Sequence, residues 1–295
     1  YRGMACDADL VLVDNAADNA SLIDPKDYYK FTYATDALGF KYIFDYAERM
    51  HQPCVINFSE GSSQDFHGYD QLYYELLAKL IGPGRIIVSS AGNDGARNSY
   101  IHKNIGKERA GAFIMGNEKR FSCTAKSKQA FTFRVSVYDN VASPQIVDIS
   151  TVNVCNAQDS LLTDSLLVGG KKYIWRVLAY PNSYDARETA YDFQISSPSK
   201  LGDSPQVSLQ VMGRDADIEL YRMSGYMFPH SLDPVLDAGD CRYTIFSPSS
   251  SPDVICVGST SYRTQFVNYL GEKKVYDSGQ KGIRSSFSAM GPTLD

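Results

Sequence analysis

The stretch Arg85–Gly95, RIIVSSAGNDG, runs from a short apolar segment into small polar residues and an asparagine. Ile86 to Ser90 predict a buried strand, because turn residues bound this apolar run on both sides. Asn93 follows the strand directly, where a side chain can emerge at the carboxyl end of a sheet. The stretch therefore raises the question of what an amide does at the end of a rigid strand.

The residues before this stretch alternate strand and helix signals. Ala8–Asp14 is an almost continuous apolar run, as in parallel strands that are covered on both faces, and Cys54–Ser59 predicts a second strand. Two stripes at helical spacing flank the second strand, one of Phe40, Ile43, Phe44 and Ala47, the other of Tyr73, Leu76, Leu77 and Leu80. Right-handed crossovers then predict an α/β fold, a parallel sheet with helices on both faces and functional groups at the strands' carboxyl ends.

From about Ala112 the apolar period changes to two. Phe131, Phe133 and Val135 alternate with polar residues, which is the pattern of a half-buried antiparallel strand. The pattern recurs in YIWRVLAY, YDFQIS, QVSLQVM and DIELYR, so we expect a β-sandwich or jelly roll. The α/β pattern returns in SPDVICVGST. We therefore expect an α/β domain over residues 1–111 and 247–295, interrupted by an inserted all-β domain over residues 112–246.

Composition narrows the function classes. A net charge of −5 gives no basic surface for nucleic acid, and no apolar run reaches the roughly 20 residues that span a membrane. The six cysteines form no CxxC motif, so we expect neither a metal site nor a cofactor. The chain does not begin with methionine and ends abruptly in SSFSAMGPTLD. These ends predict a piece of a longer protein.

Five short motifs occur in one order along the α/β-patterned parts: YRGMACDADLVLV, VINFSEG, VSSAGNDG, SPDVICVGST and SSFSAMGPTLD. Together they resemble the catalytic domain of the subtilisin-like serine peptidases. Between Asn93 and Val254 this chain has enough additional residues for a domain, whereas the family has only a short connection there. In its position this additional segment is most similar to the inserted jelly-roll domain of the clostridial Csp-type proteases. The resemblance implies a serine endopeptidase that acts on a peptide or protein substrate.

The resemblance also implies roles for particular residues. Asn93 would donate its amide N–H to the oxygen that becomes negative in the tetrahedral transition state. Removing such a donor from a subtilisin costs about 2.7–4 kcal/mol, a magnitude taken from that enzyme. The backbone of the segment Ser59, Glu60 and Gly61 would pair with an extended peptide. Beside Asn93, the small residues that would form a pocket wall are Ser89, Ser90, Ala91 and Gly92.

Two of these interpretations have plain alternatives. AGNDG is also an ordinary strand-ending turn, because Asn and Gly are favoured there. Glu60 stands where the family has leucine. It would favour a basic substrate residue if it faced a cleft, and would have no role if it faced water.

The family's catalytic Asp, His and Ser motifs do not occur in this chain. In the family's order they lie before Tyr1 and after Asp295, and that order also rejects Asp14 and His67 as catalytic residues. His102 is interpreted as a surface residue. The sequence thus predicts the central portion of a secreted peptidase, inactive on its own. The alternative is a degenerate pseudoprotease or a binding module whose β domain recognises a protein or glycan.

Overall fold

The structure, a computed structural model, describes residues 5–14, 28–140, 142–275 and 279–294. The chain divides into two compact units, each assembled from segments far apart in the sequence. Unit 1 comprises Tyr1–Ser62, Tyr69–Ser90 and Ser247–Val257; unit 2 comprises Ser63–Gly68, Ala91–Phe246 and Gly258–Asp295. The predicted domain boundaries at residues 111 and 246 stay a prediction.

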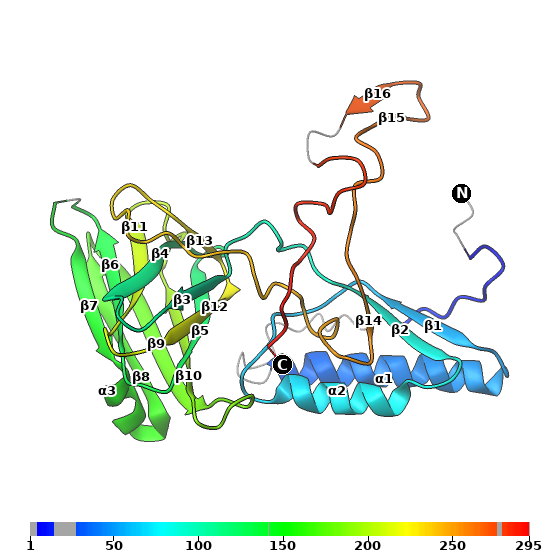
Figure 1. The fold of residues 1–295 in the computed structure, drawn as a ribbon, viewed down its shortest axis with the longest axis horizontal. Coiled ribbons are helices and arrows are strands. Elements are labelled where there is room, and N and C mark those ends of the chain that lie inside the picture. Colours follow the sequence, from blue (N-terminus) through cyan, green and yellow to red (C-terminus); the bar gives the residue numbers. More distant parts are fainter. Residues whose placement is uncertain (1–4, 15–27, 141, 276–278, 295) are drawn as a thin grey trace. The chain divides into compact units, whose positions relative to one another are not determined.

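Unit 1 contains a small parallel sheet and two helices (Figure 1). Its strands are β1 (Cys54–Phe58), β2 (Arg85–Ser90) and β14 (Ile255–Val257), in the order β1-β2-β14. The helices are α1 (Tyr28–Arg49) and α2 (Tyr69–Leu80), which agree with the two predicted stripes. Of the second stripe, Leu77 is buried, whereas Leu76 is 40% exposed.

Both helices pack against the same face of this sheet. Ile56 and Ile87 point into one cluster with residues of α1 and α2, among them Phe44 and Leu77. Because strand side chains alternate between faces, the neighbouring residues point the other way. They are exposed: Val55 by 63%, Ile86 by 39% and Ile255 by 52%. The opposite face of the sheet is therefore apolar and open.

Unit 2 is built mainly from two antiparallel sheets. The six-stranded sheet has the order β3-β12-β5-β10-β9-β8, and the five-stranded sheet has the order β13-β4-β11-β6-β7. A short hairpin is formed by β15 (Gln265–Val267) and β16 (Lys273–Val275). The other elements are β3 (Tyr100–Lys103), β4 (Arg109–Met115), β5 (Arg120–Ser127), β6 (Thr132–Tyr138), β7 (Gln145–Ser150), α3 (Thr151–Asn156), β8 (Leu161–Val168), β9 (Lys171–Pro181), β10 (Thr189–Ser196), β11 (Gln206–Met212), β12 (Ile218–Ser224) and β13 (Tyr226–Phe228).

One core cluster lies between the two antiparallel sheets. Phe133 and Val135 of β6 meet Phe193 of β10 and Trp175 of β9 there, and all are at most 5% exposed. Phe133 and Phe193 stack with their ring centroids 5.4 Å apart. The period-two residues of these strands are therefore core residues, as the alternation predicts, and Trp175 is part of the core.

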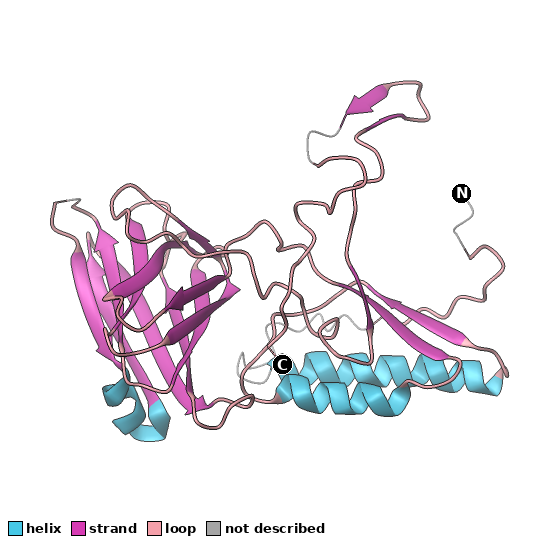
Figure 2. Cartoon of the chain, viewed as in Figure 1, coloured by secondary structure: helices cyan, strands magenta, loops and turns pink. Residues whose placement is uncertain are grey.

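The fold class predicted from the sequence is wrong. The regular secondary structure of the described residues is mostly strand in antiparallel sheets (Figure 2), not an α/β sheet with helices on both faces. The parallel pattern around β1 and β2 is real but extends to only one further described strand, β14. The bulk of the chain carries the half-buried alternation, which pairs strands antiparallel.

The predicted strand over Ala8–Asp14 is also absent. These residues form no helix or strand in the structure, and Leu10 and Leu12 are 82% and 87% exposed. A strand needs a neighbour to satisfy its backbone N–H and C=O groups, and within the described chain none pairs with this segment. Apolar composition alone therefore does not make this segment a strand.

Candidate functional site

The loop that follows β2, here called the Asn93 loop (Ala91–Asn98), is held at its backbone on both sides of Asn93. Before Asn93, the amide of Phe246 donates to the carbonyl oxygen of Ala91 at 3.1 Å, and that of Ala289 donates to Gly92 at 3.1 Å. After it, the amide of Gly95 donates to Phe287 at 2.8 Å. These bonds attach the loop to two segments distant in sequence, both within unit 2.

Two glycines make this close packing possible. At Gly92, φ is +114°, and a Cβ atom would lie 2.8 Å from the Phe246 ring. At Gly95, a Cβ would lie 1.9 Å from the carbonyl oxygen of Ser288, closer than any real contact. Only glycine fits both positions without movement of the neighbours. Packing therefore requires both glycines, and at Gly92 the positive φ favours glycine as well.

Asn93 and Asp94 lie at the tip of the loop and differ in burial. Asn93 is exposed, and its side chain makes no hydrogen bond within the described chain. Asp94 is only 8% exposed. An exposed amide on a loop held at both ends can donate to an oxygen of a bound molecule. The arrangement is thus compatible with the predicted oxyanion role, which itself stays a prediction.

Two residues of the predicted pocket wall, Ser89 and Ser90, are held by hydrogen bonds from one serine. Ser89 is 1% exposed, and its Oγ lies 2.7 Å from Oγ of Ser249. The same Ser249 hydroxyl donates to the carbonyl oxygen of Ser90 at 2.6 Å. Ser89 and Ser90 belong to unit 1, whereas Ala91 and Gly92 belong to unit 2. The end of β2 is therefore fixed within unit 1 by a serine that lies 160 residues away in the sequence.

The predicted substrate segment follows β1 in unit 1. Ser59, Glu60 and Gly61 are all exposed, and their backbone is outside any described strand pair. The exposure of Glu60 fits both of its interpretations. Asn93 belongs to the other unit, so a shared cleft between it and residues 59–61 stays a prediction.

His67, which motif order rejects as catalytic, and His102, interpreted as a surface residue, both contact aspartates. Nε2 of His67 lies 2.8 Å from Oδ2 of Asp192, and Nε2 of His102 lies 2.8 Å from Oδ1 of Asp217. In a serine-peptidase triad the carboxylate binds Nδ1, which leaves Nε2 to take the proton of the serine. Here Nε2 is occupied by a carboxylate in both pairs. Neither pair has the arrangement of a catalytic base.

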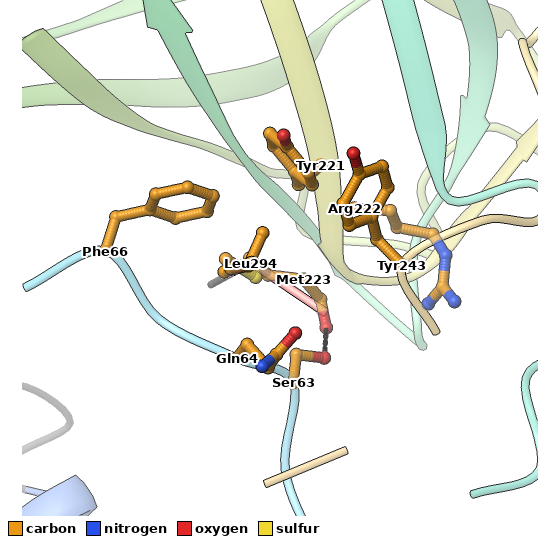
Figure 3. A pocket seen from close by; sticks show the side chains of 8 residues that line it. All are labelled: Ser63, Gln64, Phe66, Tyr221, Arg222, Met223, Tyr243 and Leu294. Carbon is orange, nitrogen blue, oxygen red and sulfur yellow. Dashed lines mark hydrogen bonds between the residues drawn. The ribbon is translucent and has the colours of Figure 1, made fainter. Parts of the chain in front are cut away.

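A small pocket in unit 2 is lined in part by Tyr221, Arg222 and Met223 of β12 (Figure 3). Gln64 borders it, is 7% exposed, and has a buried Oε1 without a hydrogen-bond partner. The space amounts to about 220 Å³, open solvent included. Ligand pockets usually hold roughly 300–1,000 Å³. The pocket is therefore too small to be the peptide cleft that the sequence predicts.

Among the described residues, no group of three or more His, Cys, Asp or Glu side chains is placed to hold a metal ion. Nor does any described helix have the length and apolar character needed to cross a membrane.

The sequence interpretation assigned no role to Asp94 in the loop or to Arg222 beside it. Arg222 is 9% exposed and makes an ion pair with Asp94. A signal for it exists in the sequence: Arg222 shares the inward phase of the alternating segment with Ile218 and Leu220. A charged residue in an apolar phase indicates a buried pair. The partner, 128 residues away, leaves no such trace.

The chain shares the fold of a clostridial protease over most of its length. It matches the structure of the Clostridium perfringens CspB protease with a TM-score of 0.57 and 16% sequence identity. The match covers 88% of this chain and 50% of that one, so the chain spans about half the length of the protease. No family model matches the sequence, and no curated protein matches it either.

Proposed function

We propose that this chain is the central portion of a subtilisin-like serine endopeptidase and contributes the oxyanion donor and part of the substrate cleft. The observation that carries the proposal is the Asn93 loop, which holds an exposed amide between two tightly packed glycines. The five ordered motifs and the shared fold with a clostridial protease support the same conclusion.

The proposed reaction is hydrolysis of a peptide bond through a tetrahedral intermediate. A serine, a histidine and an aspartate outside this chain would carry out the nucleophilic attack and the proton transfers. Asn93 would stabilise the oxyanion without reorganising, because its loop is already held in place. An extended substrate would pair with the backbone of Ser59–Gly61. Export of the full-length protein belongs to the same proposal and rests on the resemblance alone.

The test is Asn93→Ala in the full-length protein, assayed on a generic peptide substrate. We expect kcat to fall about 10²–10³-fold with little change in KM, the effect of removing the corresponding donor from a subtilisin. Asn104→Ala is the matched control, because Asn104 is an exposed asparagine in a loop of the same unit. It should leave both constants unchanged.

Other outcomes would contradict parts of the proposal. An Asn93→Ala variant with full kcat would remove the oxyanion role. A folded full-length protein that hydrolyses no peptide would favour the rival function, a pseudoprotease or binding module. The 295-residue chain alone should show no turnover, since it lacks the family's triad motifs. Turnover by the purified chain that a serine-directed inhibitor abolishes would contradict the assignment of the triad to the rest of the protein.

A further inference from the structure

A buried ion pair joins the Asn93 loop to strand β12. Nη2 of Arg222 donates to Oδ2 of Asp94 at 2.6 Å, and the two side chains are 6% and 11% exposed. Arg222 lies at an irregularity in the pairing of β12 with β5, where the register shifts between residues 222 and 224. The strand thus places a charged side chain toward the loop at the point where its regular pairing ends.

Each of the three guanidinium nitrogens of Arg222 donates a hydrogen bond within unit 2. Nε donates to the carbonyl oxygen of Asn98 at 3.1 Å, and Nη1 donates to that of Gly225 at 3.2 Å. The backbone amide of Arg222 donates to Ser99 at 2.8 Å. Figure 3 shows the guanidinium turned away from Phe66 and Leu294, which line the other side of the pocket. One side chain therefore contacts both the tip of the loop and its end.

Asp94 is held from a second side as well. Nη1 of Arg97 donates to Oδ1 of Asp94 at 2.9 Å, so each carboxylate oxygen accepts from a different arginine. Arg97 is itself placed over the ring of Tyr226 on β13, 5.1 Å from its centroid. The carboxylate is thus oriented by Arg222 of β12 and by a loop arginine that packs on β13.

The backbone hydrogen bonds that attach the loop to other segments do not involve the two residues at its tip, Asn93 and Asp94. They hold Ala91, Gly92 and Gly95, whereas no backbone hydrogen bond in the described chain involves the amide of Asn93. Asn93 thus lies between two held residues: Gly92, whose carbonyl oxygen accepts from the amide of Ala289, and Asp94, whose carboxylate accepts from two arginines. A displacement of about 1 Å in a catalytic group can lower the rate about 10²-fold. The orientation of Asn93 thus depends on where Asp94 is held.

We propose that Arg222 is a positioning residue for Asn93: through its ion pair with Asp94 it holds the oxyanion donor in place from the antiparallel sheet of unit 2. This inference rests on the proposed function. If Arg222 has this role, an antiparallel sheet of unit 2 takes part in the catalytic step. We assign the pair a role in orienting Asn93 and not in stability, because a buried ion pair is by itself weak evidence for a stabilising contribution.

The test uses the full-length protein with Arg222→Met, which keeps an unbranched apolar stem and removes the charged guanidinium. We expect kcat to fall about 10–100-fold with KM nearly unchanged, because substrate binding along residues 59–61 is not involved. Arg222→Lys should recover only part of the loss, since an ammonium cannot reproduce the guanidinium's bonds. Asp94→Asn, which preserves volume, should reproduce the loss, and a melting curve verifies that each variant is folded.

Arg187→Met is the matched control. Arg187 makes an ion pair with Asp185 at 2.8 Å in the same unit, but its side chain is 79% exposed and distant in sequence from the loop. Its kcat and KM should equal those of the parent. An equal loss of kcat in Arg187→Met and Arg222→Met would overturn the inference, because the effect would then be general.

A double-mutant cycle separates this inference from the proposed function. If Arg222 acts through Asn93, Arg222→Met should cause no further loss of kcat in an Asn93→Ala background. Losses that multiply would overturn the positioning role while the protease assignment stands. A full-length protein without peptidase activity would overturn both.

Amide hydrogen exchange gives a readout that does not depend on activity. We expect faster exchange of the Gly95 amide in Arg222→Met than in Arg187→Met, because the loop loses its attachment to β12. Equal exchange in the two variants would overturn the inference, whatever the kinetics.

Discussion

At the scale of single residues, the neighbours Asn93 and Asp94 have opposite environments, one exposed and one buried. Gly92 precedes Asn93 and packs closely against Phe246. Gly95 follows Asp94 and packs closely against Ser288. The carbonyl oxygen of Ser288 belongs to the backbone, so it cannot move aside as a flexible side chain can. This packing, rather than the turn alone, requires glycine at position 95.

Gly95→Ala is therefore expected to destabilise unit 2. A Cβ atom 1.9 Å from Ser288 O forces backbone movement, and overpacking of this kind costs about 1–3 kcal/mol, occasionally more. The measurement is the free energy of unfolding from urea denaturation. Gly82→Ala is the control, because its Cβ would meet only the end of the flexible Arg85 side chain, at 3.2 Å. Equal stabilities for the two variants would show that the loop yields easily at Gly95.

At the scale of elements, strands β5, β12 and β3 are connected by a charged cluster. Nζ of Lys126 on β5 lies 2.6 Å from Oε2 of Glu219 on β12 and 3.0 Å from Oε2 of Glu188. The hydroxyl of Tyr100 on β3 donates to Glu219 as well. Burial disfavours the charge of Glu219, but the bonds from Lys126 and Tyr100 outweigh it and hold the pKa of this carboxyl below its usual 4.5.

This lowered pKa predicts how stability depends on pH. A carboxyl whose pKa falls on folding stabilises the protein above its unfolded value and loses that contribution as pH falls through the folded value. Glu219→Gln should therefore lower the free energy of unfolding at pH 7, by roughly 1.5–3 kcal/mol for a lost charged hydrogen bond. The deficit should shrink as pH falls below about 4.5.

Denaturant unfolding at several pH values checks this prediction. Glu108→Gln serves as the control, because Glu108 is 71% exposed and its oxygen is 3.7 Å from Arg214. We expect no measurable deficit from it at any of these pH values. A Glu219→Gln deficit that persists unchanged at acid pH would mean that the charge of Glu219 is not its cause.

At the scale of the whole molecule, the two units bury their sheets differently. Unit 2 encloses its core between two antiparallel sheets, with residues such as Phe133 and Val177 fully buried. Unit 1 covers one face of its parallel sheet with α1 and α2 and leaves Val55, Ile86 and Ile255 exposed on the other. Parallel sheets normally occur with both faces covered. Unit 1 therefore presents exposed apolar side chains on one face of its sheet.

This open face predicts that the chain binds a hydrophobic dye. Val55→Thr combined with Ile255→Thr should lower the dye fluorescence, while stability stays within about 0.5 kcal/mol because both residues are exposed. Ile105→Thr is the control, since Ile105 is 63% exposed but lies in a loop of unit 2. Dye binding that is equal in both variants would show that the face is not the surface that binds it.

The local elements of the fold were predictable from the sequence. The spacing of Phe40, Phe44 and Ala47 predicts α1, and the alternation from Phe131 to Val137 predicts β6. Both patterns arise because a helix or strand exposes one side and buries the other, which neighbouring residues record. The same reasoning identified Asn93 as an exposed amide after a strand. It could not assign the amide's role, because that depends on groups elsewhere in the protein.

The sequence by itself thus determined the periodic helices and strands and the glycine-containing turn around Asn93. Only the tertiary structure decided that the antiparallel sheets dominate, that α1 and α2 share one face, and that Leu10 and Leu12 are exposed rather than part of a strand. It alone also decided that Asp94 meets Arg222, 128 residues away. The physical reason is that periodicity records which side of an element is apolar, whereas strand partners and ion pairs are chosen by contacts between distant segments that form only on folding.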